Sequence, residues 1–341
     1  MYLAVVFGFF SSIFFTLLVR RFAEKNLVLD HPDQTRKFHH KNIPLLGGVA
    51  LFISFWLPVG YILFFNPVFG IELIKNKLLA AFFGSFILIL IGIADDIKGL
   101  SARFRLVATA GAIALTVYLG IGLPKITNPL GGVIYLSELF GGVLVFIWLL
   151  GMTYTTKITD GLDGLATGIV AIGSFMLFLL SSLTKYYQPN VAWLCLVFFG
   201  VCLGFLIFNF HPASIFLGES GSLFIGFLLG VLAVISGGKV AIALLAVAIP
   251  VLDLARVIII RWREGVPIFS GDRRHLHFLL VDLGISPVIV TLSYYLVAIS
   301  FGFLALYLSS FPKIIILFLL ILVMVFLNQI LPEKNIYDHK K

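Results

Sequence analysis

The chain has 341 residues, of which 60% are hydrophobic and only 12% are charged. A soluble domain usually carries about 25% charged residues, and one core could not bury this much apolar surface in water, so an ordinary soluble protein is excluded. The net charge of +8 does not indicate nucleic-acid binding, because the basic residues lie in short loops between apolar runs, where positive charge orients a membrane protein.

The apolar residues fall in about eleven runs that are each long enough to cross a bilayer, which takes about 20 residues. Open backbone is not tolerated in lipid, so each crossing should be helical. The sequence therefore predicts an all-α polytopic membrane protein, with residues 1–341 forming a single integral membrane domain. The predicted spans are 2–19, 43–64, 77–94, 106–123, 139–156, 163–183, 191–208, 220–236, 239–260, 287–308 and 313–330.

Two sets of loops alternate between these spans and differ in charge. The charge-rich set holds eighteen of the 24 basic residues, and by the positive-inside rule it faces the cytoplasm, which places the N-terminus outside. In the other set, residues 124–138 carry the prolines and glycines of an external turn or small hairpin. The charge-rich set comprises 20–42, 95–105, 157–162, 209–219, 256–286 and the tail from 331.

Acidic residues share this asymmetry. Of the sixteen Asp and Glu residues, only Glu72 and Glu138 fall on the outer side. Acidic residues contribute little to topology, so the other fourteen indicate that carboxylates have a function at the cytoplasmic face.

Two pairs of carboxylates lie at predicted span ends. Asp95 and Asp96 follow the span at 77–94 directly, where adjacent carboxylates repel each other and lose solvation; solvated loop residues offset by nearby basic residues are the alternative. Asp160 and Asp163 lie in D-G-L-D-G, where a helical turn would put both on one face and the glycines would let a ligand approach the backbone. A simple loop turn is the alternative there.

Residues 218–222, which include Glu219, open another span with small residues whose backbone N–H groups could bind an anion. A capped helix start would explain them equally well. Asn209 and His211 precede this segment at the same surface, although either one alone is more often structural.

Basic and imidazole side chains mark two further cytoplasmic loops. Residues 272–277 read D-R-R-H-L-H, and Arg and His suit phosphate oxygens, whereas a His-x-His site for Mg²⁺ is the weaker interpretation because this ion prefers oxygen. Residues 30–39 read D-H-P-D-Q-T-R-K-F-H, and a basic loop that attracts anionic lipid is their simplest interpretation.

Taken together, these loops place carboxylates, imidazoles and guanidinium groups on one membrane face. This combination suits phosphoryl transfer, in which carboxylates hold Mg²⁺, the metal bridges a diphosphate and cations neutralise developing charge. The main alternative from another class is an ion-coupled transporter, which would place acids near span midpoints and broken helices. Only Asp253 lies well inside a predicted span. A non-catalytic scaffold would leave the acidic asymmetry unexplained.

As an ordered set, the motifs resemble those of the polyprenyl-phosphate N-acetylhexosamine-1-phosphate transferase family (glycosyltransferase family 4), in its undecaprenyl-phosphate N-acetylglucosamine-1-phosphate transferase branch. The muramoyl-pentapeptide branch has a run of three histidines that is absent here. The motifs are D-H-P-D-Q-T-R-K-F-H with I-P-L-L-G-G (30–48), A-D-D-I-K-G (94–99), T-D-G-L-D-G-L (159–165), F-N-F-H-P-A with F-L-G-E-S-G-S (208–222) and D-R-R-H-L-H (272–277).

The resemblance implies an enzyme that transfers an N-acetylhexosamine 1-phosphate, by this branch GlcNAc-1-phosphate, from a UDP-sugar to undecaprenyl phosphate. It would release UMP and start cell-envelope polysaccharide synthesis at the inner (plasma) membrane of a bacterial cell. Mg²⁺ is the implied cofactor, with Mn²⁺ as an alternative. The partners would be UDP-N-acetylhexosamine, undecaprenyl phosphate and the lipid bilayer, and a homodimer is left open. Phospho-N-acetylmuramoyl-pentapeptide transferase is the alternative within the family.

The resemblance also implies roles for residues. Asp95 and Asp96 would lie beside the Mg-diphosphate, where one would deprotonate the lipid phosphate for direct attack, which is favoured over a covalent aspartyl intermediate. Asp160 and Asp163 would bind nucleotide and organise the site, and Glu219 would ligate the metal together with Asp95. Substrate contacts would come from Arg36, Lys37, His39, Asn209 (near the uracil), Arg273, Arg274, His275 and His277.

Three residues depart from the family pattern. Lys157 replaces an Asn, Glu219 replaces an Asp and Phe278 replaces a His. Glu219 keeps the charge of Asp but adds a methylene group to a ligand whose geometry matters. These departures leave the identity of the sugar open.

Overall fold

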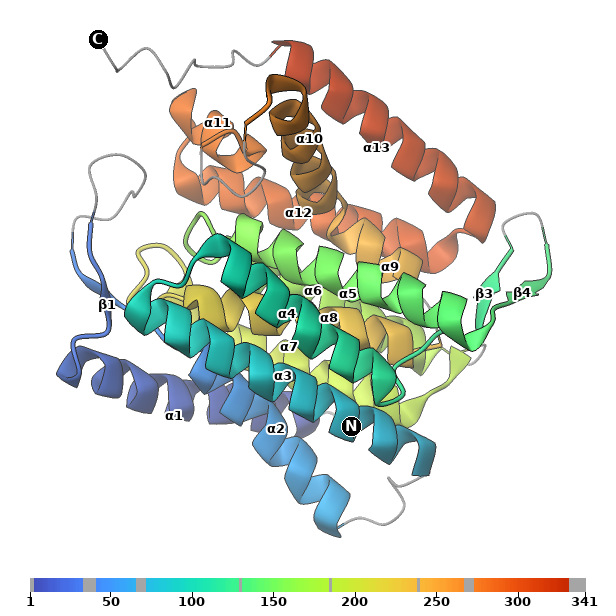
Figure 1. The fold of residues 1–341 in the computed structure, drawn as a ribbon, viewed down its shortest axis with the longest axis horizontal. Coiled ribbons are helices and arrows are strands. Elements are labelled where there is room, and N and C mark those ends of the chain that lie inside the picture. The colour runs from blue at the N-terminus through green and yellow to red at the C-terminus, as the bar shows by residue number, and fades with distance from the viewer. Residues whose placement is uncertain are drawn as a thin grey trace.

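The computed structural model describes residues 3–32, 41–65, 72–128, 131–183, 186–237, 240–266 and 273–330. Within these ranges the chain is a bundle of helices with two small two-stranded sheets (Figure 1). The helices are α1 (Leu3–Lys25), α2 (Gly47–Phe65), α3 (Glu72–Lys98), α4 (Ala102–Tyr118), α5 (Glu138–Thr159), α6 (Leu165–Ser182), α7 (Pro189–Asn209), α8 (Gly218–Ile235), α9 (Val240–Ala246), α10 (Ala248–Glu264), α11 (Leu276–Asp282), α12 (Pro287–Tyr307) and α13 (Ser310–Ile330).

The helices confirm a multi-pass, all-α membrane protein. Among the described residues, nine helices are long and apolar enough to cross a membrane, and the bent pair α9–α10 would make a tenth. The remaining predicted span, 106–123, corresponds to α4, whose 17 residues would extend only about 26 Å at 1.5 Å per residue. Each predicted span thus coincides with helix, while the count of eleven crossings is not confirmed.

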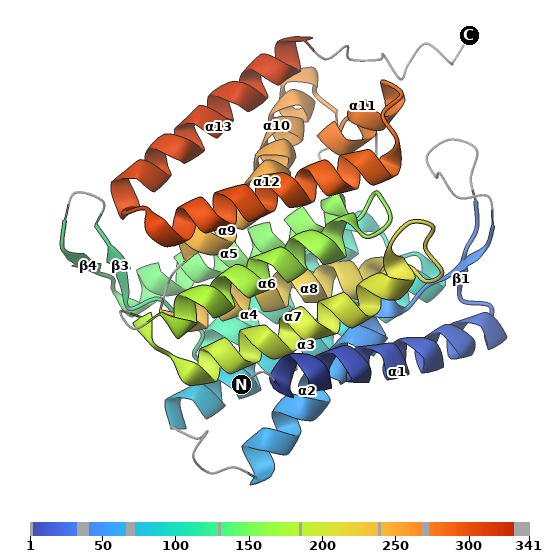
Figure 2. The same cartoon turned by 180° about the vertical axis from the view of Figure 1, so that it is seen from behind.

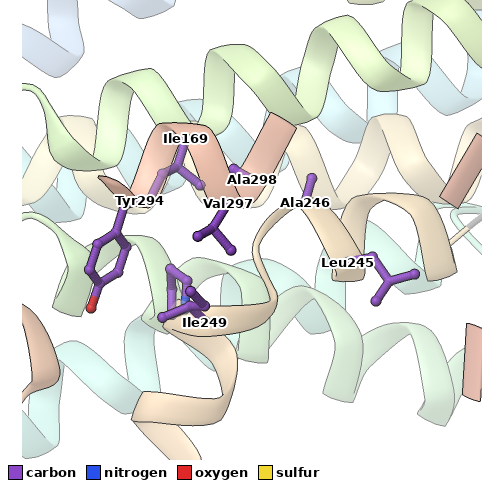
Figure 3. Close-up of a pocket in the computed structure, with 8 residues that line it drawn as sticks. Ile169, Leu245, Ala246, Ile249, Tyr294, Val297 and Ala298 are labelled. Carbon is purple, nitrogen blue, oxygen red and sulfur yellow. The ribbon is translucent and has the colours of Figure 1, made fainter. Parts of the chain in front are cut away.

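The span predicted at 239–260 is not one straight helix. It consists of α9 and α10, which meet at a bend of 79°. Figure 3 shows a small, largely apolar cavity at this bend, lined by Ala246 and Ile249 of the bent pair, Ile169 of α6 and Ala298 of α12. None of the residues that line it belongs to the predicted site, so the cavity does not mark the binding place of a charged donor.

Helix α8 lies at the centre of the bundle (Figures 1 and 2). All of residues 220–235 are buried, and α2, α3, α5, α6 and α7 pack around them. Small residues allow this close packing, as expected between helices in lipid: a Cβ atom at Gly226 would lie 1.9 Å from the Thr156 hydroxyl oxygen on α5. The start of α8 is therefore held in a fixed position by its neighbours.

The two sheets lie at opposite ends of the bundle (Figure 1). At one end, β1 (Leu29–Asp30) pairs with β2 (Ile43–Pro44). At the other end, β3 (Lys125–Thr127) and β4 (Val133–Tyr135) form an antiparallel hairpin, which confirms the hairpin predicted within 124–138. The turn between α5 and α6 and the loop between α7 and α8 lie at the β1 end (Figure 2), so the predicted motifs gather there.

Candidate active site

Asp96 of α3 caps the first turn of α8. Helix α3 continues to Lys98, so Asp95 and Asp96 lie in its last turn rather than in a loop after the span. The Asp96 carboxylate accepts hydrogen bonds from the backbone nitrogen atoms of Glu219 (2.7 Å) and Ser220 (3.3 Å) and from the Ser220 hydroxyl (2.8 Å). Unpaired N–H groups and the helix dipole make an N-terminus an anion site. At the start of α8 this anion is the Asp96 carboxylate.

Glycines permit this junction between α3 and α8. A Cβ atom at Gly92 would lie 2.1 Å from the Ser220 Cα atom, which leaves no room for a side chain. Gly218 has a φ of +69°, and a Cβ atom there would lie 2.6 Å from the Asp96 carboxylate. The two glycines are therefore required for Asp96 to reach the start of α8.

The I-P-L-L-G-G motif pairs with the segment before α8 through backbone groups. Phe216 donates to the Pro44 carbonyl (2.9 Å), and Gly47 and Gly48 donate to the carbonyl oxygens of Phe216 (3.1 Å) and Leu217 (3.0 Å). Two motifs that are far apart in the chain thus form one structural unit. Together they hold the segment that precedes Glu219 and so fix the position of Glu219.

Arg105 joins the carboxylates of two other motifs. Its Nη1 atom lies 2.7 Å from Asp95 Oδ2, and its Nε atom lies 3.1 Å from Glu219 Oε1. Lys157 Nζ lies 2.5 Å from the same Glu219 oxygen. These four side chains are between 12% and 19% exposed, so α3, α4, α5 and α8 each contribute one half-buried charge to a single cluster. Neither Arg105 nor Lys157 is among the predicted site residues.

Asp160 and Asp163 lie in the turn between α5 and α6 and have different surroundings. Asp163 Oδ2 accepts hydrogen bonds from His211 Nδ1 (2.9 Å) and from the Ala213 backbone (3.0 Å). No group within the described ranges donates a hydrogen bond to the Asp160 carboxylate. Burial and then the nearby carboxylates, Glu219 first, raise the pKa of Asp160 well above its usual value. Asp160 therefore belongs to the same electrostatic cluster as Glu219.

Asn209 lies at the end of α7 and is almost fully buried. Its amide accepts a hydrogen bond from the Thr167 hydroxyl (2.9 Å) and donates one to the Ile215 carbonyl (3.1 Å). Through its oxygen and nitrogen atoms, the amide joins α7 to α6 and to the loop that follows α7. The predicted contact of Asn209 with uracil stays a prediction.

The D-R-R-H-L-H segment is anchored by Asp253 of α10. Asp253 Oδ2 lies 2.9 Å from His275 Nδ1, and Asp253 Oδ1 accepts from Arg256 (2.9 Å) and from the Leu276 backbone (3.1 Å). Sequence reasoning did not assign Asp253 to this segment. An ion-coupled transporter would place an acid near a broken helix, as here, but this carboxylate already holds a cation, an imidazole and a helix start. The observation does not favour transport.

His277 connects this segment to the turn that holds Asp160. A Cβ atom at Gly161 would lie 2.4 Å from His277 Nε2, so the glycine backbone packs directly on the imidazole ring. The ring also lies 4.2 Å from the Phe278 ring centroid. Burial lowers the pKa of His277 to about 3, which keeps the ring neutral near pH 7. His277 is thus a neutral ring beside the Gly161 backbone, and its buried Nε2 atom has no hydrogen-bond partner among the described residues.

The remaining predicted substrate contacts come from basic side chains. Arg273 pairs with Asp282 (2.6 Å), and Arg274 pairs with Glu264. Their contact with substrate stays a prediction. Arg36, Lys37 and His39 lie outside the described residues.

The expected Mg²⁺ can be tested against the donor groups of the cluster. Within the described ranges, no group of three or more His, Cys, Asp or Glu side chains could hold a metal ion. Glu219 Oε1 already has the cations of Arg105 and Lys157 within 3.1 Å. A divalent ion on this oxygen would meet two positive charges, so the arrangement does not fit a metal bound to Glu219. Mg²⁺ elsewhere in the site stays a prediction.

The fold and the cluster define a multi-pass membrane protein with a half-buried charged site at one end of its bundle. The family described as Glycosyl transferase family 4 matches residues 78–237 of the chain. A probable undecaprenyl-phosphate N-acetylglucosaminyl 1-phosphate transferase from Bacillus subtilis is 31% identical to it, over 99% of this chain and 93% of the relative. The chain belongs to glycosyl transferase family 4, as its motifs predict.

Two further relatives carry names from both branches of the family. A decaprenyl-phosphate N-acetylglucosaminephosphotransferase from Mycobacterium tuberculosis is 30% identical, over 82% of this chain and 75% of the relative. A phospho-N-acetylmuramoyl-pentapeptide-transferase from a Wolbachia species is 27% identical, over 86% of this chain and 93% of the relative. The identity is slightly higher to the two relatives that are named for N-acetylglucosamine.

Proposed function

We propose that the chain transfers N-acetylglucosamine 1-phosphate from UDP-GlcNAc to undecaprenyl phosphate and releases UMP, as the first step of a cell-envelope polysaccharide. The site would face the cytoplasm at the inner (plasma) membrane of a bacterial cell. The observation that carries the proposal is the Arg105 bridge between Asp95 and Glu219. It brings two of the predicted motifs into one site at the end of the bundle. The names of the relatives support the same chemistry.

The proposed reaction depends on positive charge that stabilises its transition state, and it does not require a covalent catalyst. An oxygen of the lipid phosphate forms a bond to the β-phosphorus of the donor. The bond from that phosphorus to the bridging oxygen breaks, and UMP leaves with the electron pair. Charge develops on the phosphoryl and bridging oxygens, and fixed cations in a half-buried site stabilise it. Arg105 and Lys157 are the cations that the cluster offers.

The contacts of Asp95 and Asp96 favour direct attack over an aspartyl intermediate. Asp95 accepts hydrogen bonds from Arg105 and from the Leu100 backbone (2.7 Å each), while Asp96 holds the start of α8. Either residue would have to give up these contacts to act as a nucleophile or to deprotonate the lipid phosphate. In this proposal Asp95 orients Arg105 and Asp96 positions Glu219.

The test is transfer by purified protein in lipid nanodiscs that contain undecaprenyl phosphate. UMP should appear when UDP-GlcNAc is added and should be absent when the lipid phosphate is omitted. UDP-MurNAc-pentapeptide in place of UDP-GlcNAc tests the other branch of the family. Ion flux in proteoliposomes without any UMP release would support the transporter and refute the proposal.

A further inference from the structure

Two of the three departures from the family motifs contact each other. Lys157 and Glu219 are 62 positions apart in the chain, yet Lys157 Nζ lies 2.5 Å from Glu219 Oε1. The longer Glu side chain and the long Lys side chain together span the space between α5 and α8. The two substitutions are therefore one structural feature, an ion pair inside the site.

The backbone on both sides of this ion pair is fixed. The Thr156 hydroxyl donates to the Ser222 carbonyl (2.8 Å), and Trp148 Nε1 donates to the Gly230 carbonyl (3.0 Å). Both bonds join α5 to α8, and the first lies one residue before Lys157. The Lys157 ammonium group also lies 5.4 Å from the centroid of the Tyr154 ring, within reach of a cation–π contact. The ammonium group is thus held in place by its surroundings.

The four side chains joined by these ion pairs balance in charge without a metal, and the Asp96 and Asp160 carboxylates lie outside the ion pairs. Asp95 and Glu219 contribute two negative charges, and Arg105 and Lys157 contribute two positive charges, all four side chains being at most 19% exposed. An ammonium group has three N–H donors and a guanidinium group has five, which is more than these two carboxylates require. Donors therefore remain for the phosphate oxygens of a ligand.

We propose that the Lys157 ammonium group is the resident cation of the donor site. It supplies, beside Glu219, the positive charge that binds the diphosphate of a nucleotide-sugar, and no divalent ion binds Glu219. The identity of the ligand rests on the proposed function, whereas the competition between Lys157 and a metal for Glu219 does not.

The first test measures metal binding alone, with Mn²⁺ as the probe and electron paramagnetic resonance of the full-length protein in detergent as the readout. Lys157→Asn should bind Mn²⁺ at least about tenfold more tightly than the wild type, because it removes one of the two cations at Glu219 and leaves Arg105 as the only described cation beside that carboxylate. The double variant Lys157→Asn/Glu219→Gln should lose this gain. Lys25→Asn, at an exposed lysine in α1, is the matched control and should behave like the wild type.

The opposite pattern overturns the proposal. If the wild type binds Mn²⁺ as tightly as Lys157→Asn does, and Glu219→Gln alone abolishes that binding, then Glu219 is a metal ligand despite Lys157. The comparison of the wild type with Glu219→Gln remains decisive even if Lys157→Asn does not fold.

The second test measures UDP-GlcNAc binding by calorimetry with EDTA or with Mg²⁺. The wild type should bind the donor in EDTA, and Lys157→Asn should lose affinity by at least about tenfold in EDTA and regain it with Mg²⁺. Loss of wild-type donor binding in EDTA would count against Lys157 as the resident cation. A wild type that binds no UDP-GlcNAc in either condition would refute the proposed function instead, and the Mn²⁺ result would stand by itself.

Discussion

Asp96 on α3 and Ser220 on α8 are 124 positions apart in the chain, yet the Ser220 hydroxyl and backbone nitrogen lie 2.8 Å and 3.3 Å from one oxygen of the Asp96 carboxylate. This contact places the start of α8, and with it Glu219, beside α3. The Asp96 carboxylate thus occupies the N-terminus of α8, where an anionic ligand could otherwise bind. The site is assembled around this contact.

Replacing Asp96 with Asn should lower the thermal stability of the protein. Both oxygens of the Asp96 carboxylate accept hydrogen bonds from the start of α8, and Asn replaces one of them with an NH₂ group that cannot accept, at a cost of about 0.5–2 kcal/mol. Unfolding followed by intrinsic fluorescence in detergent measures the effect. Glu138→Gln is the matched control, because Glu138 is an exposed residue in the first turn of α5. Equal losses in the two variants would contradict the capping role.

Replacing Gly92 with Ala should separate α3 from α8. The added methyl group would lie 2.1 Å from the Ser220 Cα atom, and such overpacking costs about 1–3 kcal/mol. Gly111→Ala on α4 is the control, because a methyl group there meets nothing within 4 Å, and it should be neutral or stabilising by roughly 0.5–1 kcal/mol. Thermal unfolding distinguishes the two variants, and a well-tolerated Gly92→Ala would argue against this junction.

Replacing Asp160 with Asn should raise stability and lower turnover. The pKa of Asp160 is raised in the folded state, so the stability it contributes is present at low pH and is lost as the pH rises and the carboxylate ionises. At pH 8 the neutral amide removes that cost and should raise the midpoint of thermal unfolding. Turnover should fall by about 10²-fold or more if the carboxylate acts in the site. Unchanged turnover would show that the Asp160 carboxylate does not act in the site.

His277 should make stability fall in acid. Its pKa is lowered to about 3 by burial, whereas an unfolded chain protonates His near pH 6.5. The unfolded state therefore binds the proton more readily, and stability is lost as the pH falls from about 6.5 towards 3. His277→Gln should flatten this dependence, measured as unfolding midpoints between pH 4.5 and 8. His31→Gln, at an exposed histidine, should leave it unchanged, and identical curves for both variants would contradict the burial effect.

The helices and the gathering of motifs at one end could be predicted because both follow from local properties of the sequence. Apolar runs of crossing length form helix in lipid, and alternating loops must lie at alternate ends. The bend between α9 and α10 was not predicted, although Pro250 lies in the run at 239–260 and a proline ring clashes with the carbonyl four residues earlier, here that of Ala246, the last residue of α9.

The contacts of each carboxylate depend on rotation and depth, which the sequence does not report. Asp95 and Asp96 look equivalent in the chain, but successive residues on a helix point about 100° apart, so one meets Arg105 and the other meets α8. Arg105 and Lys157 were missed because basic residues at span ends are also what orientation in a membrane requires. Their spacing along the chain does not reveal that both meet Glu219.

The most direct test of the central claim follows the β-phosphorus of the donor. Wild-type protein in nanodiscs with undecaprenyl phosphate receives UDP-GlcNAc that carries ³²P at the β-position, and the lipid and water-soluble products are separated. A sugar-1-phosphate transferase predicts that the label enters the lipid fraction and that the released nucleotide is unlabelled UMP. Label that remains in UDP, with unlabelled lipid, would show transfer of the sugar alone and would contradict the account.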